Sequence, residues 1–204
     1  MVYYDYIEIG TSDFDTEIEK ATEDTVGLTI EPLKHYLDKL PNKPKCIKIN
    51  SAISTYDGHI DMYSIHPDVI EKYNFPFWVK GLNSINHYHP QALYYVKNLN
   101  LNKDEIFSID KVEVMQFKTL INKYHITGCQ YLKVDTEGHD HVILNNYLDL
   151  INNYNQNLLA DKILFESNFL SDNNEITKLI QRFSKFGYQI LHQTPEDTLL
   201  YRPV

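Results

Sequence analysis

KVDTEGHDHVIL, residues 133–144, joins the end of an apolar strand to the beginning of an apolar helix. The run CQYLKVD predicts the strand, and HDHVILNNYLDLINNY predicts the helix. Between them, three acids and two histidines fall within residues 135–141. A strand that leads through a polar loop into a helix is the repeating unit of parallel α/β sheets, whose ligands bind at the carboxyl ends of the strands. We therefore expect Asp135 to lie at the ligand-binding edge of a central strand.

The same alternation of strands and helices continues on both sides of this stretch. Strands are predicted in VYYDYIEIG, VGLTIEP, KCIKINSAIS, YDGHIDMYSI, KVEVMQF and DKILFES, and helices in DTEIEKATED, LKHYLDKL and KTLINKYH. After the helix EITKLIQRFSKF, the runs YQILHQ and TLLYRP predict an antiparallel hairpin. Residues 68–109, with several prolines and aromatic side chains, predict an insertion over one end of the sheet. We expect a single α/β domain over residues 1–204, with a mainly parallel sheet covered by helices on both faces.

The composition narrows the class of partner. Lys and Arg number 19 against 28 Asp and Glu, a formal charge of −9, which disfavours nucleic acid and anionic membranes as partners. A small molecule or a glycan is expected instead. Cys46 and Cys129 stand in apolar strand-like runs without metal or redox spacing, which indicates reduced core residues and a cytoplasmic protein. No apolar run approaches the roughly twenty residues of a membrane span.

The turn EIGTSDFDT, residues 8–16, is the first candidate ligand site. It has a single glycine, Gly10, whereas a dinucleotide fingerprint needs three so that the backbone can approach a pyrophosphate. Glu8, Asp13 and Asp15 add negative charge, which opposes a phosphate but suits a ligand that carries an ammonium and a sulfonium. Glu31, at the end of the next strand, is placed to accept hydrogen bonds from both hydroxyls of a ribose. The two features together predict a cationic nucleoside as the ligand.

These motifs carry a family resemblance. YIEIGTSDFDT, VGLTIEP, INSAIS, GLNSINHYHP and above all LKVDTEGHDHVIL resemble, in this order, the landmarks of FkbM-type methyltransferases, from about Tyr4 to Glu166. The resemblance implies a Rossmann-like seven-stranded sheet of order 3-2-1-4-5-7-6, S-adenosylmethionine as the cofactor, and transfer of a methyl group to a hydroxyl. By position it implies a cofactor site made of Glu8, Gly10, Thr11, Ser12, Asp13, Glu31, Pro32, Ser51, Ala52 and Asp135. Phe14 departs from the usual glycine-rich first turn of the family.

Several roles are open for the acidic loop. Asp135, Glu137 and His139 are candidate catalytic residues, since methylation of a hydroxyl requires positioning and removal of its proton. Asp135 and Glu137 with His139 or His141 could instead bind Mg²⁺ or Mn²⁺, a divalent metal that we do not favour. A third interpretation is helix capping by Asp135 or Thr136, with the acids near the positive end of the helix dipole. Capping and catalysis are compatible, and we expect both.

The insertion offers candidate acceptor-binding side chains in WVKGLNSINHYHP, residues 78–90. Aromatic rings and polar tips suit a sugar, although a buried loop uses the same residues for packing, and a zinc pair of His87 and His89 is a weaker alternative. The predicted substrate-binding residues are Asn83, Ser84, His87 and Glu166. Glu166, at the end of the neighbouring strand KILFE, could equally be the acid that pairs with Lys133 or Lys162. The sequence thus predicts a methyltransferase that acts on a sugar, a glycan or another small hydroxylated metabolite. The alternatives are a non-catalytic nucleoside-binding protein of the same fold and a nicotinamide oxidoreductase, which the missing glycines disfavour.

Overall fold

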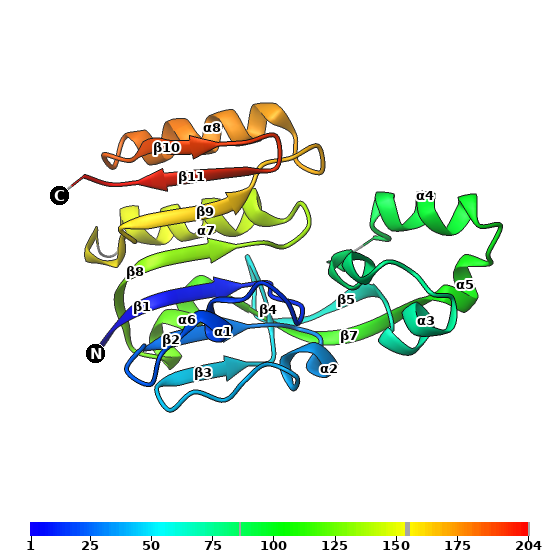
Figure 1. Ribbon diagram of the computed structural model, residues 1–204. Coiled ribbons are helices and arrows are strands. Elements are labelled where there is room, and N and C mark those ends of the chain that lie inside the picture. The colour runs from blue at the N-terminus through cyan, green and yellow to red at the C-terminus, as the bar shows by residue number, and fades with distance from the viewer. Residues whose placement is uncertain (86, 154–155, 204) are drawn as a thin grey trace.

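The structure, a computed structural model, describes residues 1–85, 87–153 and 156–203. It is a mixed α/β structure with a seven-stranded and a four-stranded sheet (Figure 1). In the larger sheet the strands pair in parallel, except for an antiparallel hairpin at one edge. Its strands are β1 (Val2–Ile9), β2 (Gly27–Ile30), β3 (Cys46–Ile49), β8 (Ile126–Val134), β9 (Lys162–Glu166), β10 (Gln189–Gln193) and β11 (Asp197–Tyr201).

The larger sheet has the order β10-β11-β9-β8-β1-β2-β3. These labels differ from the expected order 3-2-1-4-5-7-6 because four strands of the second sheet lie between β3 and β8 in the chain. Counted among its own seven strands, the large sheet runs 3-2-1-4-5-7-6. The central strands β1 and β8 are buried over most of their length, as parallel strands covered on both faces must be.

Three helices cover one face of the large sheet: α6 (Phe117–Lys123), α7 (Asp140–Asn153) and α8 (Asn173–Ser184) (Figure 1). Their apolar residues join those of the strands in the main core, which includes Ile143, Leu148 and Leu179. The short helices α1 (Glu17–Lys20) and α2 (Lys34–Leu37) pack on the other face, against Tyr6 of β1. Both are shorter than DTEIEKATED and LKHYLDKL predict. Residues after α1 turn at Thr22, whose N–H bonds to the Thr25 hydroxyl at 3.0 Å instead of continuing the helix.

The insertion is larger than predicted. It begins not at residue 68 but at the second sheet, whose first strand follows β3 directly. KCIKINSAIS, expected as one strand, divides at Asn50, whose side-chain amide donates to the carbonyls of Glu31 and Pro32 at 3.0 and 2.8 Å. The second sheet has the order β4-β7-β5-β6, with strands β4 (Ala52–Ser54), β5 (Gly58–Ile65), β6 (Ser84–Ile85) and β7 (Phe107–Gln116).

Helices accompany the second sheet and form with it a lobe beside the carboxyl ends of the large sheet (Figure 1). The lobe has its own small core, which includes Ile65, Val79, Val96 and Ile106. Its helices are α3 (Pro67–Lys72), η1 (Phe77–Gly81), α4 (Pro90–Asn98) and α5 (Lys103–Ile106); a further short helix, η2 (Gln156–Leu158), precedes β9. The predicted strands YDGHIDMYSI and KVEVMQF are present, but they pair with each other in this lobe.

The parallel register brings four chain turns to one edge of the large sheet. Ile9 pairs with Ile30 and Val134, and Val134 pairs with Phe165. The residues that follow β1, β2, β8 and β9 therefore meet where the lobe adjoins the sheet. This is the edge at which ligands of open α/β sheets bind.

Candidate active site

The turn after β1 lies directly against the turn after β8. Gly10 has φ +80°, and a Cβ atom there would lie 1.9 Å from the carbonyl oxygen of Asp135. Gly10 N–H donates to Ile30 O at 2.9 Å, and Asp135 N–H donates to Ile9 O at 2.9 Å. The single glycine of the turn is thus required by the contact between two chain turns and by its positive φ.

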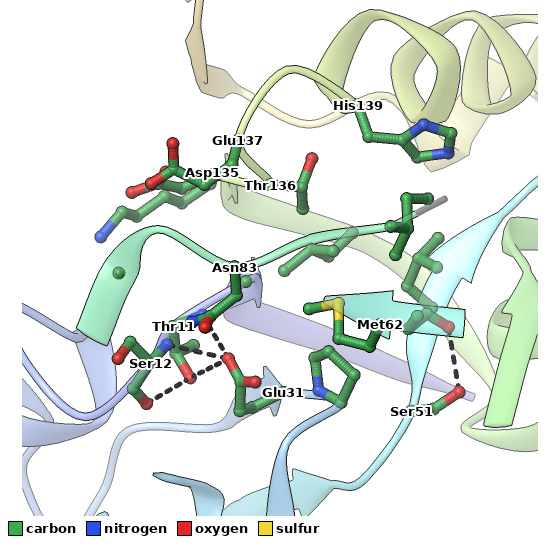
Figure 2. Close-up of a pocket in the computed structure, with 18 of the residues that line it drawn as sticks. Thr11, Ser12, Glu31, Ser51, Met62, Asn83, Asp135, Thr136, Glu137 and His139 are labelled. Atoms are coloured by element: carbon green, nitrogen blue, oxygen red, sulfur yellow. Dashed lines mark hydrogen bonds between the residues drawn. The ribbon is translucent and has the colours of Figure 1, made fainter. Parts of the chain in front are cut away.

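Glu31 is the anchor of the first turn. Its carboxylate accepts hydrogen bonds from the N–H groups of Ser12 (2.8 Å), Thr11 (3.1 Å) and Leu33 (2.8 Å) (Figure 2). The side chain is 3 % exposed, and this burial, opposed by the hydrogen bonds, raises its pKa to about 7. From the sequence, Glu31 is predicted to bind a ribose. In the structure its carboxylate also holds the turn that would surround the ligand.

A cavity opens beside Glu31, between the strand ends and the lobe. The space between its lining atoms, including the part open to solvent, is about 840 Å³. Asp135 and Glu137 lie on one side of it and Met62 on another (Figure 2). Ile53 and Ile85 add further apolar atoms to its lining. Eleven of the predicted site residues line it: Gly10, Thr11, Ser12, Glu31, Pro32, Ser51, Ala52, Asn83, Asp135, Glu137 and His139.

Two predicted cofactor residues lie outside the lining. Glu8 is fully buried and forms an ion pair with Lys133 at 3.1 Å; it also accepts from Glu17 N–H at 2.9 Å. Burial, opposed by Lys133, raises the pKa of Glu8 to about 7. Asp13 forms ion pairs with Lys80 of the lobe and with Lys39. Partial burial opposes ionisation of Asp13, but these two lysines bring its pKa below the usual value. Both acids therefore support the walls of the site.

The loop between β8 and α7 carries the two acids Asp135 and Glu137. Helix α7 begins only at Asp140, so neither Asp135 nor Thr136 is its N-cap, contrary to the capping interpretation. Asp140 is buried, accepts from Thr136 N–H at 2.8 Å and from Glu166 N–H at 2.8 Å, and ties the loop to β9. Glu137 has φ +53°, an unusual conformation for a residue with a side chain.

Glu137 contacts the lobe through His89, which was considered from the sequence as a sugar-pocket side chain and as half of a zinc pair, but was not among the predicted site residues. Its Oε2 lies 2.9 Å from Nε2 of His89, which is fully buried. Burial and the neighbouring charges of Asp135 and Asp140 raise the pKa of Glu137 to about 9, and burial lowers that of His89 to about 4. Because proline favours the first position of a helix, the His89-Pro90 pair was the signal available in the sequence.

His139 faces the cavity, not bulk solvent. Its Nε2 lies 3.0 Å from the hydroxyl of Ser54 at the end of β4. Burial, with the nearby His141 and His87, lowers the pKa of His139 to about 4. The imidazole is thus neutral at physiological pH and able to hydrogen-bond in either direction.

Asp135 is the most accessible of the acids in the loop. It is exposed in the cavity, but protein encloses the cavity on several sides, and this enclosure, opposed by Lys133, raises its pKa. Oxygens of Asp135, Glu137 and Glu166 lie within 4.8 Å of one another. Glu166, however, uses both oxygens, since Oε2 accepts from Gly138 N–H at 3.0 Å and Oε1 from the Asn168 amide at 2.6 Å. Three of the six oxygens of this group, Oε2 of Glu137 and both oxygens of Glu166, thus already accept hydrogen bonds, which disfavours a divalent metal.

A second cavity meets the first at Glu137, which lines both. The predicted acceptor residue His87 lines this second cavity, whereas Asn83 lines the first. Ser84 and Glu166 line neither; Ser84 is buried, and its hydroxyl lies 3.2 Å from Nδ1 of His87. His87 and His89 have different partners, which opposes the zinc pair. The other residues of the second cavity are Pro90, Gly138, Phe169 and Leu170.

One buried polar atom of the first cavity lacks a partner. The side-chain oxygen of Asn83 finds no hydrogen-bond donor among the described residues, although its amide group donates to Lys80 O at 2.6 Å. An unpaired buried carbonyl costs about 1–3 kcal/mol. Because Asn83 is 7 % exposed and lines the cavity, a ligand with a donor group would remove this cost.

The comparisons with known proteins agree with this architecture. The sequence model of the methyltransferase FkbM domain matches residues 6–190. The chain belongs to the FkbM methyltransferase family. It is similar in fold to the crystal structure of methyltransferase FkbM from Methylobacillus flagellatus KT, with a TM-score of 0.54 and 12 % sequence identity. That match covers 98 % of this chain and 44 % of the other. No curated protein matches the chain.

Two further expectations can be compared with the structure. Cys46 and Cys129 are free, as predicted, and Cys129 is buried. Within residues 1–85, 87–153 and 156–203, no helix has the length and apolar character needed to cross a membrane.

Proposed function

We propose that this FkbM-family protein is an S-adenosylmethionine-dependent O-methyltransferase that acts on a hydroxyl of a sugar, a glycan or another small metabolite. The observation that carries the proposal is the cavity at the strand ends, which joins an acidic side to an apolar side across Glu31. The chain spans less than half of the similar solved protein, so the activity of that protein is no more than a guide.

The residues of the cavity fit the methyl donor. Its acidic side suits the cationic amino-acid end, and Ile53 and Met62 offer an apolar contact for an adenine ring. The unpaired oxygen of Asn83 suits a hydroxyl or amine donor on the ligand. Glu31 Oε1 accepts one hydrogen bond, from Leu33, and has a lone pair left for a ribose hydroxyl.

The chain supplies positioning and proton transfer. When bound, S-adenosylmethionine supplies an electrophilic methyl group on a sulfonium. Asp135 contributes negative charge beside the bound cation, and Glu31 and Asn83 orient the nucleoside. Glu137 lies where the two cavities meet, so an acceptor hydroxyl in the second cavity can give its proton to Oε1 of Glu137.

The raised pKa of Glu137 suits this role. A carboxyl group with a pKa of about 9 is mainly protonated at neutral pH in the unliganded protein. A cation in the adjoining cavity favours the ionised form, and so lowers this pKa towards the working pH. Donor binding would thereby produce the base when it is needed.

The experiment has two parts. Isothermal titration calorimetry with S-adenosylmethionine should give a dissociation constant in the micromolar range, and failure to bind would remove the donor from the proposal. Methyl transfer should then be followed with a radiolabelled donor on a panel of monosaccharides, glycans and hydroxylated metabolites. Binding without transfer to any acceptor would instead favour the non-catalytic nucleoside-binding alternative.

A further inference from the structure

His89 has a fixed tautomer. It is the N-cap of α4, and its Nδ1 accepts a hydrogen bond from Gln91 N–H at 3.2 Å, so Nδ1 carries no proton. The imidazole is fully buried and neutral. Its proton is therefore on Nε2, the atom 2.9 Å from Oε2 of Glu137, and His89 is the donor in this bond.

This bond determines how Glu137 presents its two oxygens. Oε2 is occupied by His89, whereas Oε1 accepts no hydrogen bond from the described residues. The backbone of Glu137 adopts a positive φ, and the next amide, that of Gly138, is held by Glu166 at 3.0 Å. The peptide on one side and the imidazole on the other thus hold the carboxylate at the junction of the two cavities.

We propose that His89, contributed by the inserted lobe, is a positioning residue that orients Glu137 for proton transfer from the acceptor. The proposal rests on the proposed function, since it assigns to Glu137 the role of base. It gives the insertion a part in the chemistry, because the lobe supplies the donor that selects one rotamer of a carboxylate in the loop after β8. Other charged groups around Glu137 are the acids Asp135, Asp140, Glu166 and Glu196.

The chain offers a matched control. His66 also precedes a proline and also caps a helix, with Nδ1 accepting from Asp68 N–H at 3.3 Å. Its side chain is 44 % exposed and lines neither cavity. A capping role alone would make His66 and His89 equivalent, whereas a positioning role belongs to His89 only.

Two substitutions separate the two roles of His89. Asn in place of His89 keeps a capping oxygen near the position of Nδ1 but is too short to reach Glu137. Gln in place of His89 carries an amide donor near the position of Nε2. The set to compare is the wild type, H89N, H89Q and the control H66N.

The first readout needs no donor or acceptor. The pKa of Glu137 is measured by NMR of ¹³C-labelled carboxylates in the protein alone, with the signal assigned from E137Q. H89N should raise the pKa of Glu137 by about 1, because one hydrogen bond to the charged form is lost. H89Q should return it towards the wild-type value, and H66N should leave it unchanged.

The second readout is methyl transfer from the radiolabelled donor to a monosaccharide mixture. H89N should lower kcat about tenfold and move the acid limb of the pH profile, with little change in the KM for the donor; H89Q should recover part of the loss. An unchanged pKa and turnover in H89N, or an equal loss in H66N, would overturn the proposal. Failure of the wild type to bind the donor would defeat the proposed function, while the carboxylate titration would still decide whether His89 controls Glu137.

A third measurement covers the case in which H89N does not fold. Long-range ¹H–¹⁵N correlation of the wild type should show His89 protonated at Nε2 and not at Nδ1. In E137Q the Nε2 proton resonance should shift. A proton on Nδ1, or an Nε2 resonance that E137Q leaves in place, would refute the inference.

Discussion

Glu31→Gln tests the double role of the carboxylate at the end of β2. A glutamine side chain has one acceptor oxygen, whereas Glu31 uses Oε2 for Thr11 and Ser12 and Oε1 for Leu33. Whichever way the amide turns, its NH₂ group faces at least one buried N–H donor. A buried N–H group without a partner costs about 1–3 kcal/mol, so the free energy of unfolding should fall by about that amount.

The same substitution should weaken the donor. Loss of the carboxylate acceptor and loosening of the Thr11–Ser12 turn should lower the affinity for S-adenosylmethionine about tenfold or more, which corresponds to about 1.4 kcal/mol. The assays are urea unfolding followed by the fluorescence of Trp78, and calorimetric titration with the donor. Both belong at pH 8, above the Glu31 pKa of about 7, so that the wild-type carboxylate is mainly ionised.

Asp57→Asn is the matched control. Asp57 also accepts three hydrogen bonds, from the N–H and side chain of Gln116 and from Thr119, but it is exposed and lines neither cavity. Its substitution should leave donor affinity unchanged. Unchanged affinity in Glu31→Gln would refute the ribose assignment, and unchanged stability would refute the role of Glu31 in holding the turn.

Three further outcomes follow from the site. Asp135→Asn and Glu137→Gln should each reduce turnover at least tenfold and donor affinity much less, because their effect falls on transfer; full activity in both variants would leave the loop without a catalytic role. Turnover should survive dialysis against EDTA, since three of the six oxygens of the acid group already accept hydrogen bonds, and a loss restored by Mg²⁺ or Mn²⁺ would reverse this expectation. The pKa values of Glu8, Glu31 and Asp140 are each raised to about 7 by burial, so the folded state holds protons that the unfolded state has released above about pH 4–5. The stability they contribute is fully present below that range and is lost as the pH rises through 7. Urea unfolding at pH 7, 7.5 and 8 should show decreasing stability, and an increase would contradict the sign. At these pH values His89 and His139, whose lowered pKa values act in the opposite direction at lower pH, are mainly neutral in both the folded and the unfolded state.

Sequence reasoning reached much of the large sheet because its signals are local. Apolar runs that end in polar turns located every strand of that sheet, and the tail hairpin appeared where it was expected. Eleven predicted residues meet in one cavity because parallel strands bring their carboxyl ends to one edge. Helices α1 and α2 came out shorter than predicted; after α1 the chain turns where Thr22 N–H bonds to the Thr25 hydroxyl.

The partners of side chains were less predictable. Glu8, Asp13 and Glu166 have the residue type of ligand-binding acids. In the structure, however, Glu8 forms an ion pair with Lys133, Asp13 forms one with Lys80, and Glu166 accepts a hydrogen bond from Gly138 N–H. The second sheet was missed for a related reason. A sequence pattern identifies a strand but not the strand that it pairs with, and β5 and β7 pair with each other instead of joining the large sheet.

The sequence by itself determined the family, the acidic character of the site and its place at the strand ends, because each depends on short motifs whose residues are close together in the chain. The meeting of His89 with Glu137, 48 positions apart, was decided only by the tertiary structure. Glu137 lies in the loop after β8 and His89 precedes α4 in the lobe, so the packing of the lobe against the strand ends brings the two residues together. The stretch KVDTEGHDHVIL therefore supplies acids of the site, while the lobe determines how one of them, Glu137, is oriented.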